Sequence, residues 1–260
     1  MNKAILCLLA SFLAQTLIFA VMPVQALSTK DRIPFHAGEK LSYVLKWSII
    51  PVGEATLEVL NGEMKTGESA YLLKVSVKSY PIIDLFYRVR DHIESYVDRS
   101  VTHSLLYRKK QHEGRHERDI MVNFDWDKAK AHYYNKGKHE RSVNILPGTF
   151  DPLSVFYAFR LYPLKDGLEV ETPVTDGKKC VMGRAKVIKR ERMKVDAGEF
   201  DTFLIEPELQ NIGGIFKKSK DAKLRVWVTA DDRRILVKAE SKVVVGHFTA
   251  ELVSAEGVLQ

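Results

Sequence analysis

Charged and histidine side chains are concentrated in one stretch of the sequence, between Arg108 and Asp119. This stretch has five Lys or Arg residues, three Asp or Glu residues and two His residues, and no large apolar side chain. Such a basic stripe can bind an anionic component of a cell envelope, such as lipid A, a phospholipid or peptidoglycan. The mixed signs fit equally well a long hairpin whose arms project into solvent, and this simpler interpretation is favoured.

His112 and His116 could share a metal ion only if this stretch were helical, because residues i and i+4 meet on one helix face. On a strand the two side chains would lie ~13 Å apart at ~3.3 Å per residue, which is too far to bind one ion. Gly114 and its polar flanks favour a strand or a hairpin. His132 and His139 could join a metal site only through folding. The sequence therefore predicts no metal site and no cofactor.

No catalytic motif is present in the sequence. It has no Gly-x-Ser-x-Gly, His-Glu-x-x-His, phosphate-binding loop or dinucleotide fingerprint. The carboxylate pairs Asp91 with Glu94 and Asp231 with Asp232 could perform acid–base chemistry, but turns contain such pairs routinely. Cys180 lacks a neighbouring nucleophile signature, and a lone thiol in a strand-like segment is usually inert. No catalytic residue is predicted, and a binding protein is favoured over an enzyme.

Tyr157, Arg160 and Trp227 are the candidate ligand-binding residues. Tyr157 and Arg160 are spaced i and i+3, so on a helix they share one face. There the Arg could pair with a phosphate or carboxylate while the Tyr ring covers an acyl chain or a sugar. Trp227 is out of phase with Leu224, Val226 and Val228 on its strand, so it lines a different surface. The alternative is that the aromatic rings are core residues and that Arg160 pairs with a carboxylate such as Glu94 or Asp91.

The elements that would position these residues are mostly strands. Apolar residues alternate with polar ones in at least six segments, which is typical of half-buried antiparallel strands. Leu41, Tyr43, Leu45 and Trp47 form one such series, and the segments around 55–59, 71–77, 120–126, 224–228 and 235–252 repeat the pattern. Turn residues separate them. We therefore expect a mainly β protein with a single strongly curved antiparallel sheet, either an open barrel or a flattened sandwich.

One segment has helical spacing instead. Asp151 is suited to cap a helix and Pro152 to begin it, apolar residues follow at helical spacing, and Pro163 ends the run. This predicts one short helix over 151–162, about three turns long, packed on the concave or open side of the sheet. Residues 81–85 are a second candidate for a helical turn.

The first 26 residues have the features of a secretory signal peptide. Lys3 precedes an apolar stretch, and Val24-Gln25-Ala26 fits a cleavage site. An uncleaved membrane anchor is the alternative, because the stretch approaches the ~18 to 20 residues that a span requires. Cleavage would lower the formal net charge from +7 to +6, because Lys3 is the one charged residue removed. It would also leave Cys180 as the one cysteine, so no internal disulfide is expected in the periplasm.

The whole pattern resembles the exported bacterial family called domain of unknown function 3108. The resemblance rests on Gly38 to Tyr43, Gly53 with Ala55 and Leu57, Asp91 with Glu94 to Tyr96, Asp151 to Ser154 with Tyr157 and Arg160, Gly198 to Phe200 with Thr202, and Val226 to Val228 with Asp231 and Arg234. It implies a periplasmic β-rich protein and assigns no catalytic residue. No break in composition divides residues 27–260, so a single domain is expected.

Composition limits the function further. Hydrophobic residues make up 45% of the chain and there are only 2 Cys, which excludes disordered chains and disulfide scaffolds. Nucleic acid is not expected as a partner of an exported chain. We expect a periplasmic, non-enzymatic protein that holds a lipid, lipoprotein or glycan of the cell envelope in a cleft, with at most peripheral membrane contact. The alternatives are a hydrolase or transferase acting on a cell-wall polymer and a scaffold that binds a partner by sheet-edge pairing.

Overall fold

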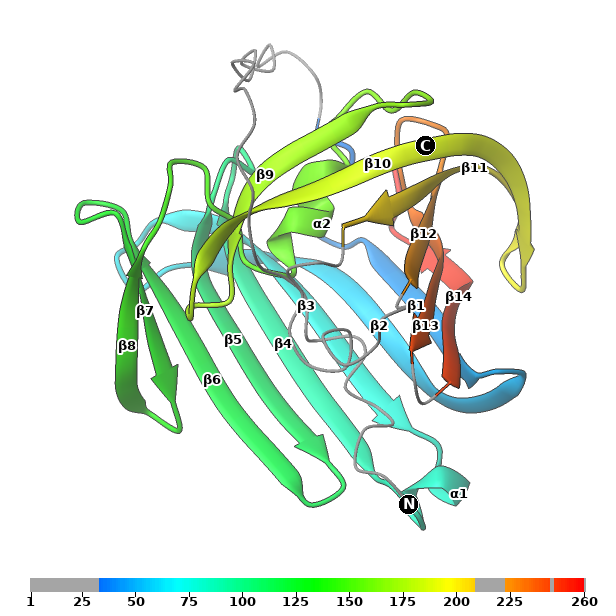
Figure 1. The fold of residues 1–260 in the computed structure, drawn as a ribbon, viewed down its shortest axis with the longest axis horizontal. Helices are drawn as coiled ribbons and strands as arrows, with labels where there is room; N and C mark the ends of the chain where they lie inside the picture. Colours follow the sequence, from blue (N-terminus) through cyan, green and yellow to red (C-terminus); the bar gives the residue numbers. More distant parts are fainter. Residues whose placement is uncertain (1–32, 209–222, 244–245, 260) are drawn as a thin grey trace.

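The computed structural model describes residues 33–208, 223–243 and 246–259. The predicted signal peptide, residues 1–26, lies outside the described residues. All fourteen strands belong to one antiparallel sheet, in the order β8-β7-β6-β5-β4-β3-β2-β1-β14-β13-β12-β11-β10-β9 (Figure 1). The strands are β1 (Lys40–Trp47), β2 (Ile50–Glu63), β3 (Ser69–Ser79), β4 (Val89–Asp98), β5 (Ser104–Glu113), β6 (His116–Asp125), β7 (Lys130–Asn135), β8 (Lys138–Asn144), β9 (Glu169–Thr175), β10 (Cys180–Val195), β11 (Gly198–Pro207), β12 (Lys223–Thr229), β13 (Leu236–Val243) and β14 (Gly246–Glu256). The predicted mainly β fold with a single antiparallel sheet is confirmed.

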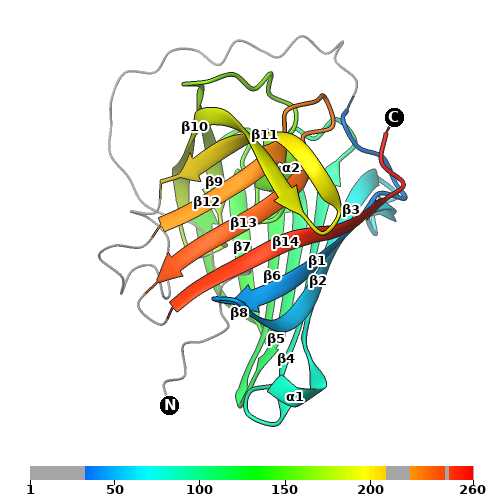
Figure 2. The ribbon, with the colours of Figure 1, turned by 90° about the vertical axis from the view of Figure 1, so that its right-hand side faces the viewer.

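The sheet is strongly curled but does not close into a barrel. Strands β8 and β9 remain its two edges, and Figures 1 and 2 show the two halves of the sheet facing each other. Edge strand β8 is exposed along nearly its whole length and carries several charged residues. Charged, exposed edges discourage pairing with a second chain.

The turn between β9 and β10 lies against the strands near the opposite edge. Gly177 has a φ of +84°, and a Cβ at this position would lie 2.7 Å from a methyl group of Val122 and 2.9 Å from the Tyr133 ring. Phe150 and Val174 add a parallel bridge beside this turn. These contacts connect the β9 edge of the open sheet to strands near its β8 edge.

Side-chain alternation explains which face of each strand is buried. In β1, Leu41, Tyr43 and Leu45 are buried on the concave face, whereas the residues between them are only partly covered. Most buried apolar side chains join one core, and a second core forms between the helix region and strands β10 to β13. The curled sheet therefore buries its inner face against itself and against a helix.

That helix is α2 (Ser154–Phe159), which lies between the two halves of the sheet (Figure 1). The predicted range of 151–162 was too long. Asp151 does cap the segment, because its Oδ1 accepts the backbone N–H groups of Leu153 and Ser154. After Phe159, however, the backbone N–H groups of residues 160–162 bond to carbonyls three residues back. Such i to i−3 bonds tighten the chain into a turn and end the α-helix. The second helical turn is confirmed as α1 (Pro81–Asp84).

Candidate functional site

A cavity of about 210 Å³ lies between α2 and the concave faces of both halves of the sheet. Strands β1 to β5 line one side of it, strands β9 to β13 line the other, and the α2 region covers it. Its lining includes Leu41, Leu57, Val75, Ile93, Tyr107, Leu153, Val155, Phe156, Tyr157, Phe159, Val170, Val174, Ala185, Ile205, Leu224, Val226, Val228, Leu236 and Ala239. Phe156 and Glu208 are the exposed members of the lining, so they mark its solvent side.

This cavity is large for a protein interior. One water molecule needs only ~10 to 15 Å³ measured in this way, and natural cores contain few larger voids. The cavity opens to solvent beside Phe156 and Glu208, yet most of its lining side chains are apolar. A concave and mostly apolar space with a few polar groups is typical of a ligand-binding site.

A smaller cavity of about 70 Å³ adjoins the main one, because Leu224 and Ala239 line both. Its lining includes the polar residues Asp91 and Ser241. Asp91 is buried and accepts hydrogen bonds from the Gln111 side chain and the His112 backbone. Ser241 is also buried, and its hydroxyl has no hydrogen-bond partner in the described part of the chain. The two cavities thus share part of their wall, and buried polar side chains lie at the smaller one.

Tyr157 lines the main cavity, as its position on α2 suggested. Only 2% of it is exposed, and its ring packs edge-on against Phe35 at 5.0 Å between centroids. Its hydroxyl has no hydrogen-bond partner among the described residues. Burial, and then the charge of Glu39, raise the pKa of Tyr157 well above its ordinary value. The side chain is therefore a neutral phenol with an unused donor beside the cavity.

Arg160 also borders the cavity, but its guanidinium is already bound. It donates hydrogen bonds to both carboxylate oxygens of Glu39, at 2.5 and 2.8 Å, and to the backbone carbonyls of Pro34 and Arg233. Burial alone would lower the pKa of Arg160, but the hydrogen bonds and charge of Glu39 raise it. The carboxylate partner is Glu39 rather than Glu94 or Asp91. Arg160 joins α2 to the segment before β1 and to the β12–β13 turn.

Trp227 lies on the opposite face of the sheet from this cavity. Its strand neighbours Val226 and Val228 line the cavity, and Trp227 is not among the lining residues. Its indole N–H donates to Glu191 at 2.9 Å, and the ammonium group of Lys238 lies 5.6 Å from its ring centroid. The structure therefore brings Tyr157 and Arg160 together but not Trp227.

The other candidate residues named from the sequence also lie in different parts of the fold. Asp91 is buried on the inner face of β4, whereas Glu94 is three residues along that strand and therefore on its outer face, where it pairs with Arg108. His112 and His116 lie on β5 and β6, and His112 pairs with Glu117. No group of three or more His, Cys, Asp or Glu side chains in the described ranges could hold a metal ion. The stripe 108–119 forms the β5–β6 hairpin.

The sequence predicts a cleft but does not identify most of its lining, because the lining is distributed over ten strands and one helix. Each lining residue is an ordinary apolar member of an alternating pattern. The unused hydroxyl groups of Tyr157 and Ser241 are equally invisible before the fold is known.

Comparison with known protein families gives a match to "Protein of unknown function (DUF3108)" over residues 42–253. The chain belongs to this family. The match includes most of β1, all of β2 to β13 and most of β14, together with the helix that covers the cavity. Comparison with curated proteins gives no match. Family membership therefore brings no activity to the site.

Solved structures with a similar fold include a β-barrel-like protein of the DUF1849 domain family from Brucella abortus. It has a TM-score of 0.56 at 12% sequence identity, and the match covers 87% of this chain and 99% of that one. An exported protein with a YmcC-like fold from Bacteroides fragilis matches with a TM-score of 0.36 at 8% identity, covering 86% and 97% of the two chains. The first of these shows a shared fold. Among the described residues, no helix is long and apolar enough to cross a membrane.

Proposed function

We propose that this DUF3108 protein binds an envelope lipid, or the acyl chain of a lipoprotein, in the main cavity. The observation that carries the proposal is the apolar space of about 210 Å³ between α2 and the curled sheet. Ligand pockets are typically concave and mostly apolar, with a few placed polar groups. A hydrocarbon chain in this space would bury its own apolar surface together with that of the lining side chains.

The lining favours an acyl chain over a glycan. Sugars need many hydrogen-bonding side chains, because each buried hydroxyl without a partner is costly. Among the side chains that line the main cavity, the strictly polar ones are Arg160, Thr172, Arg184, Glu208 and Arg234. Arg160 is bound to Glu39, and Arg184 pairs with Glu171. A hydrocarbon chain needs none of these groups.

The smaller cavity would take the polar end of the ligand. The Ser241 hydroxyl is buried there without a partner among the residues that the structure describes, and a buried hydroxyl of this kind costs about 1–3 kcal/mol. A hydroxyl or ester carbonyl of the ligand would satisfy it. The signal peptide predicted for residues 1–26 supports the periplasm as the place where binding occurs.

The test is to replace a residue of the cavity wall with a larger side chain that occupies the cavity. Ala239 lines both cavities on β13, so Ala239→Phe would place a ring where the ligand is proposed to lie. Ala255→Phe, at an exposed position on the neighbouring strand β14, is the matched control. The measurements are native mass spectrometry of protein purified without detergent and titration with the fluorescent fatty acid cis-parinaric acid.

We expect bound lipid and parinaric acid fluorescence with the wild type and with Ala255→Phe, and a loss of both with folded Ala239→Phe. Equal binding by the two variants would contradict the proposal. So would a wild type that carries no lipid and takes up no parinaric acid. Release of cleaved cell-wall fragments by the purified protein would favour the hydrolase alternative.

A further inference from the structure

Three large apolar side chains project into solvent from the loop around α1. Ile82 is 64% exposed, Leu85 is 75% exposed and Phe86 is 72% exposed. Single exposed apolar residues are common, but three within five positions of one loop are not explained by ordinary surface composition. We call the side chains of Ile82, Leu85 and Phe86 the apolar knob.

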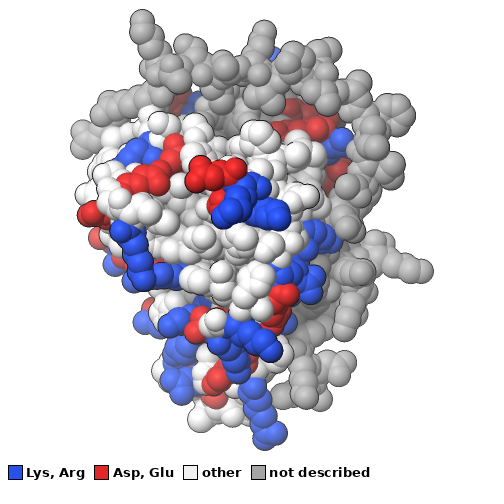
Figure 3. All heavy atoms as spheres, turned by 90° about the vertical axis from the view of Figure 1, so that its left-hand side faces the viewer, with Lys and Arg blue, Asp and Glu red and all other residues white. Residues whose placement is uncertain are grey.

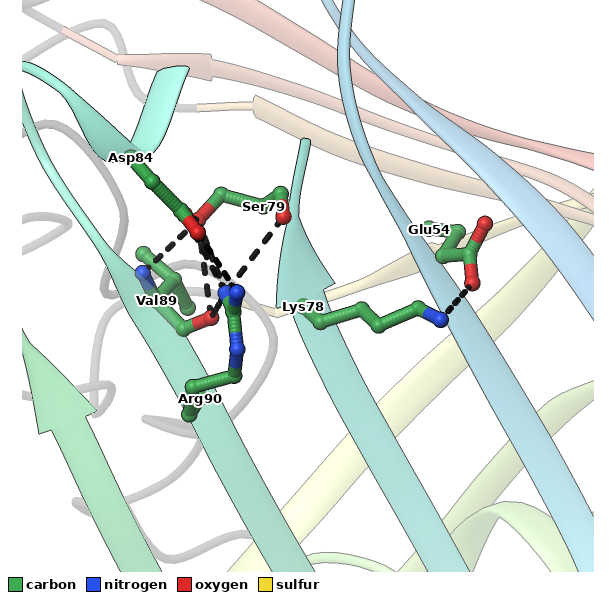
Figure 4. Close-up of polar contacts among 6 residues, drawn as sticks. All are labelled: Glu54, Lys78, Ser79, Asp84, Val89 and Arg90. Carbon is green, nitrogen blue, oxygen red and sulfur yellow. Dashed lines mark hydrogen bonds and ion pairs between the residues drawn. The ribbon is translucent and has the colours of Figure 1, made fainter. Parts of the chain in front are cut away.

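The knob stands on a fixed base. Asp84 is held by Arg90, whose two Nη groups reach its carboxylate oxygens at 3.1 and 2.5 Å, and Ser79 also donates to it (Figure 4). The Ser79 hydroxyl in turn accepts the backbone N–H of Val89 at 2.8 Å. The two ends of the loop are thus tied together by Asp84, Ser79 and Arg90. The exposure of the knob is a feature of a well-bonded loop.

Backbone bonds add to this base. Tyr80 donates its N–H to the Val52 carbonyl, and Gly114 donates its N–H to the Arg88 carbonyl. Gly114 also packs against the Tyr87 ring, where a Cβ would come within 2.9 Å of a ring carbon. The α1 loop is therefore fastened to the start of β2 on one side and to the β5–β6 turn on the other.

Exposed cations accompany the knob. Arg88 lies on the loop itself, and Arg115 and Arg118 lie at the β5–β6 turn that the loop contacts. Figure 3 shows Lys and Arg side chains gathered toward the lower end of the face that it draws, with some acidic side chains among them. The β5–β6 turn and α1 lie at this lower end in Figure 1. The Gly114 to Arg88 backbone bond places the tip of the β5–β6 hairpin, with the exposed Arg115, beside the α1 loop.

The β1–β2 turn and the first residue of β2 add two more exposed apolar side chains. Ile49 is 89% exposed and Ile50 is 54% exposed. They lie a few residues before Val52, whose carbonyl accepts the Tyr80 N–H at the start of the α1 loop. Two turns joined by this backbone bond therefore both expose apolar side chains.

We propose that the apolar knob and its flanking arginines dock this protein onto an anionic phospholipid surface. Large apolar side chains enter the boundary between headgroups and acyl chains, while Arg side chains attract anionic headgroups. A fixed loop loses little conformational freedom on docking. The cations beside the knob favour an anionic lipid surface over an apolar protein partner.

The test is flotation with lipid vesicles. The full mature chain is mixed with vesicles of phosphatidylethanolamine alone or with added phosphatidylglycerol, and bound protein is measured at low and high salt. Leu85→Ser/Phe86→Ser removes two knob residues, and Arg88→Gln/Arg115→Gln removes two cations. Val253→Ser, at an exposed apolar position on β14, is the matched control. Phe86→Trp supplies a fluorescent probe at the knob.

We expect the wild type and Val253→Ser to float with the phosphatidylglycerol vesicles. The knob variant should bind about tenfold more weakly or worse, because two apolar side chains no longer leave water. The arginine variant should lose the dependence on phosphatidylglycerol, and the Phe86→Trp emission should shift to the blue on vesicles. Thermal unfolding checks that each variant is folded.

Absence of wild-type binding to the anionic vesicles, or equal binding by the folded knob variant, would overturn the proposal. The proposal would also fail if the wild type were a dimer that did not bind vesicles and the knob variant were a monomer. The knob would then be a protein interface. The cavity is not needed for docking. Ala239→Phe should therefore float as the wild type does, so failure of the cavity proposal and failure of this one can be told apart.

Discussion

Arg160 and Glu39 form a bidentate ion pair across 121 positions of the sequence, with both partners buried. Glu39 is 1% exposed and Arg160 is 6% exposed. The pair fastens α2, which covers the main cavity, to the segment that leads into β1. The ion pair therefore supports the helix that covers the cavity, and the effect of removing it on stability can be measured.

We expect Arg160→Met to destabilise the protein strongly. The substitution leaves Glu39 buried without its cation and leaves the carbonyls of Pro34 and Arg233 without a donor. Removing one partner of a buried ion pair typically costs about 3–5 kcal/mol. Urea unfolding followed by fluorescence measures the loss.

The double variant Glu39→Met/Arg160→Met is the control for this prediction. Replacing both partners removes the unpaired charge, so part of the lost free energy of unfolding should return. A folded Arg160→Met variant with unchanged stability that no longer retains lipid would contradict this interpretation. It would instead make Arg160 a ligand-binding residue, as the sequence suggested.

Tyr157→Phe should leave the stability of the ligand-free protein unchanged or raise it by up to about 1 kcal/mol. The Tyr157 hydroxyl is buried without a hydrogen-bond partner among the described residues, so removing it relieves a desolvation cost. Thermal unfolding of lipid-free protein tests this. Weaker parinaric acid binding by the same variant would show that the hydroxyl meets the ligand, whereas a loss of several degrees in Tm would show that it has a structural partner.

The strands could be predicted from the sequence because each is a local pattern. In β1, β3 and β14, alternating apolar residues identify the buried face without knowledge of the neighbouring strands. Trp47 is an instructive exception, because it continues the alternation of β1 yet is 38% exposed. It is the last residue of its strand, where the sheet no longer covers it.

The candidate site could be predicted only in part. Tyr157 and Arg160 share the covering helix as their spacing required, but the partner of Arg160 comes from a distant segment that no local pattern connects to it. The helix is shorter than predicted at both ends, because the α-helix begins at Ser154 and the i to i−3 bonds after Phe159 end it before Pro163. The cavity depends on the curl of the whole sheet, which strand patterns alone do not determine.

The curl of the sheet is itself testable at Gly177. A side chain there would meet Val122 and Tyr133 and would have to adopt a φ of +84°. We expect Gly177→Ala to cost about 2 kcal/mol or more, from backbone strain and overpacking together. Gly137→Ala is the matched control, because Gly137 has a φ of +76° with nothing within 4 Å of the added Cβ. Equal losses in the two variants would show that the β9–β10 turn does not rest on β6 and β7.

The hydrogen-bonded base of the apolar knob, formed by Asp84, Ser79 and Arg90, should respond to pH through Asp84. Hydrogen bonds from Arg90, and then from Ser79, hold the pKa of the Asp84 carboxyl below its ordinary value of 3.8. A carboxyl whose pKa is lowered by folding contributes stability above its unfolded pKa and loses it as the pH falls through the folded pKa. The hydrogen bonds of Asp84 with Arg90 and Ser79 should therefore be intact at neutral pH and should break only in strongly acidic solution. NMR titration of the Asp84 carboxyl carbon measures the midpoint.

Arg90→Gln should move that midpoint up toward 3.8, whereas Arg88→Gln, which removes a weaker influence on the same carboxyl, should move it less. An Asp84 midpoint that Arg90→Gln leaves in place would show that the ion pair does not hold the loop.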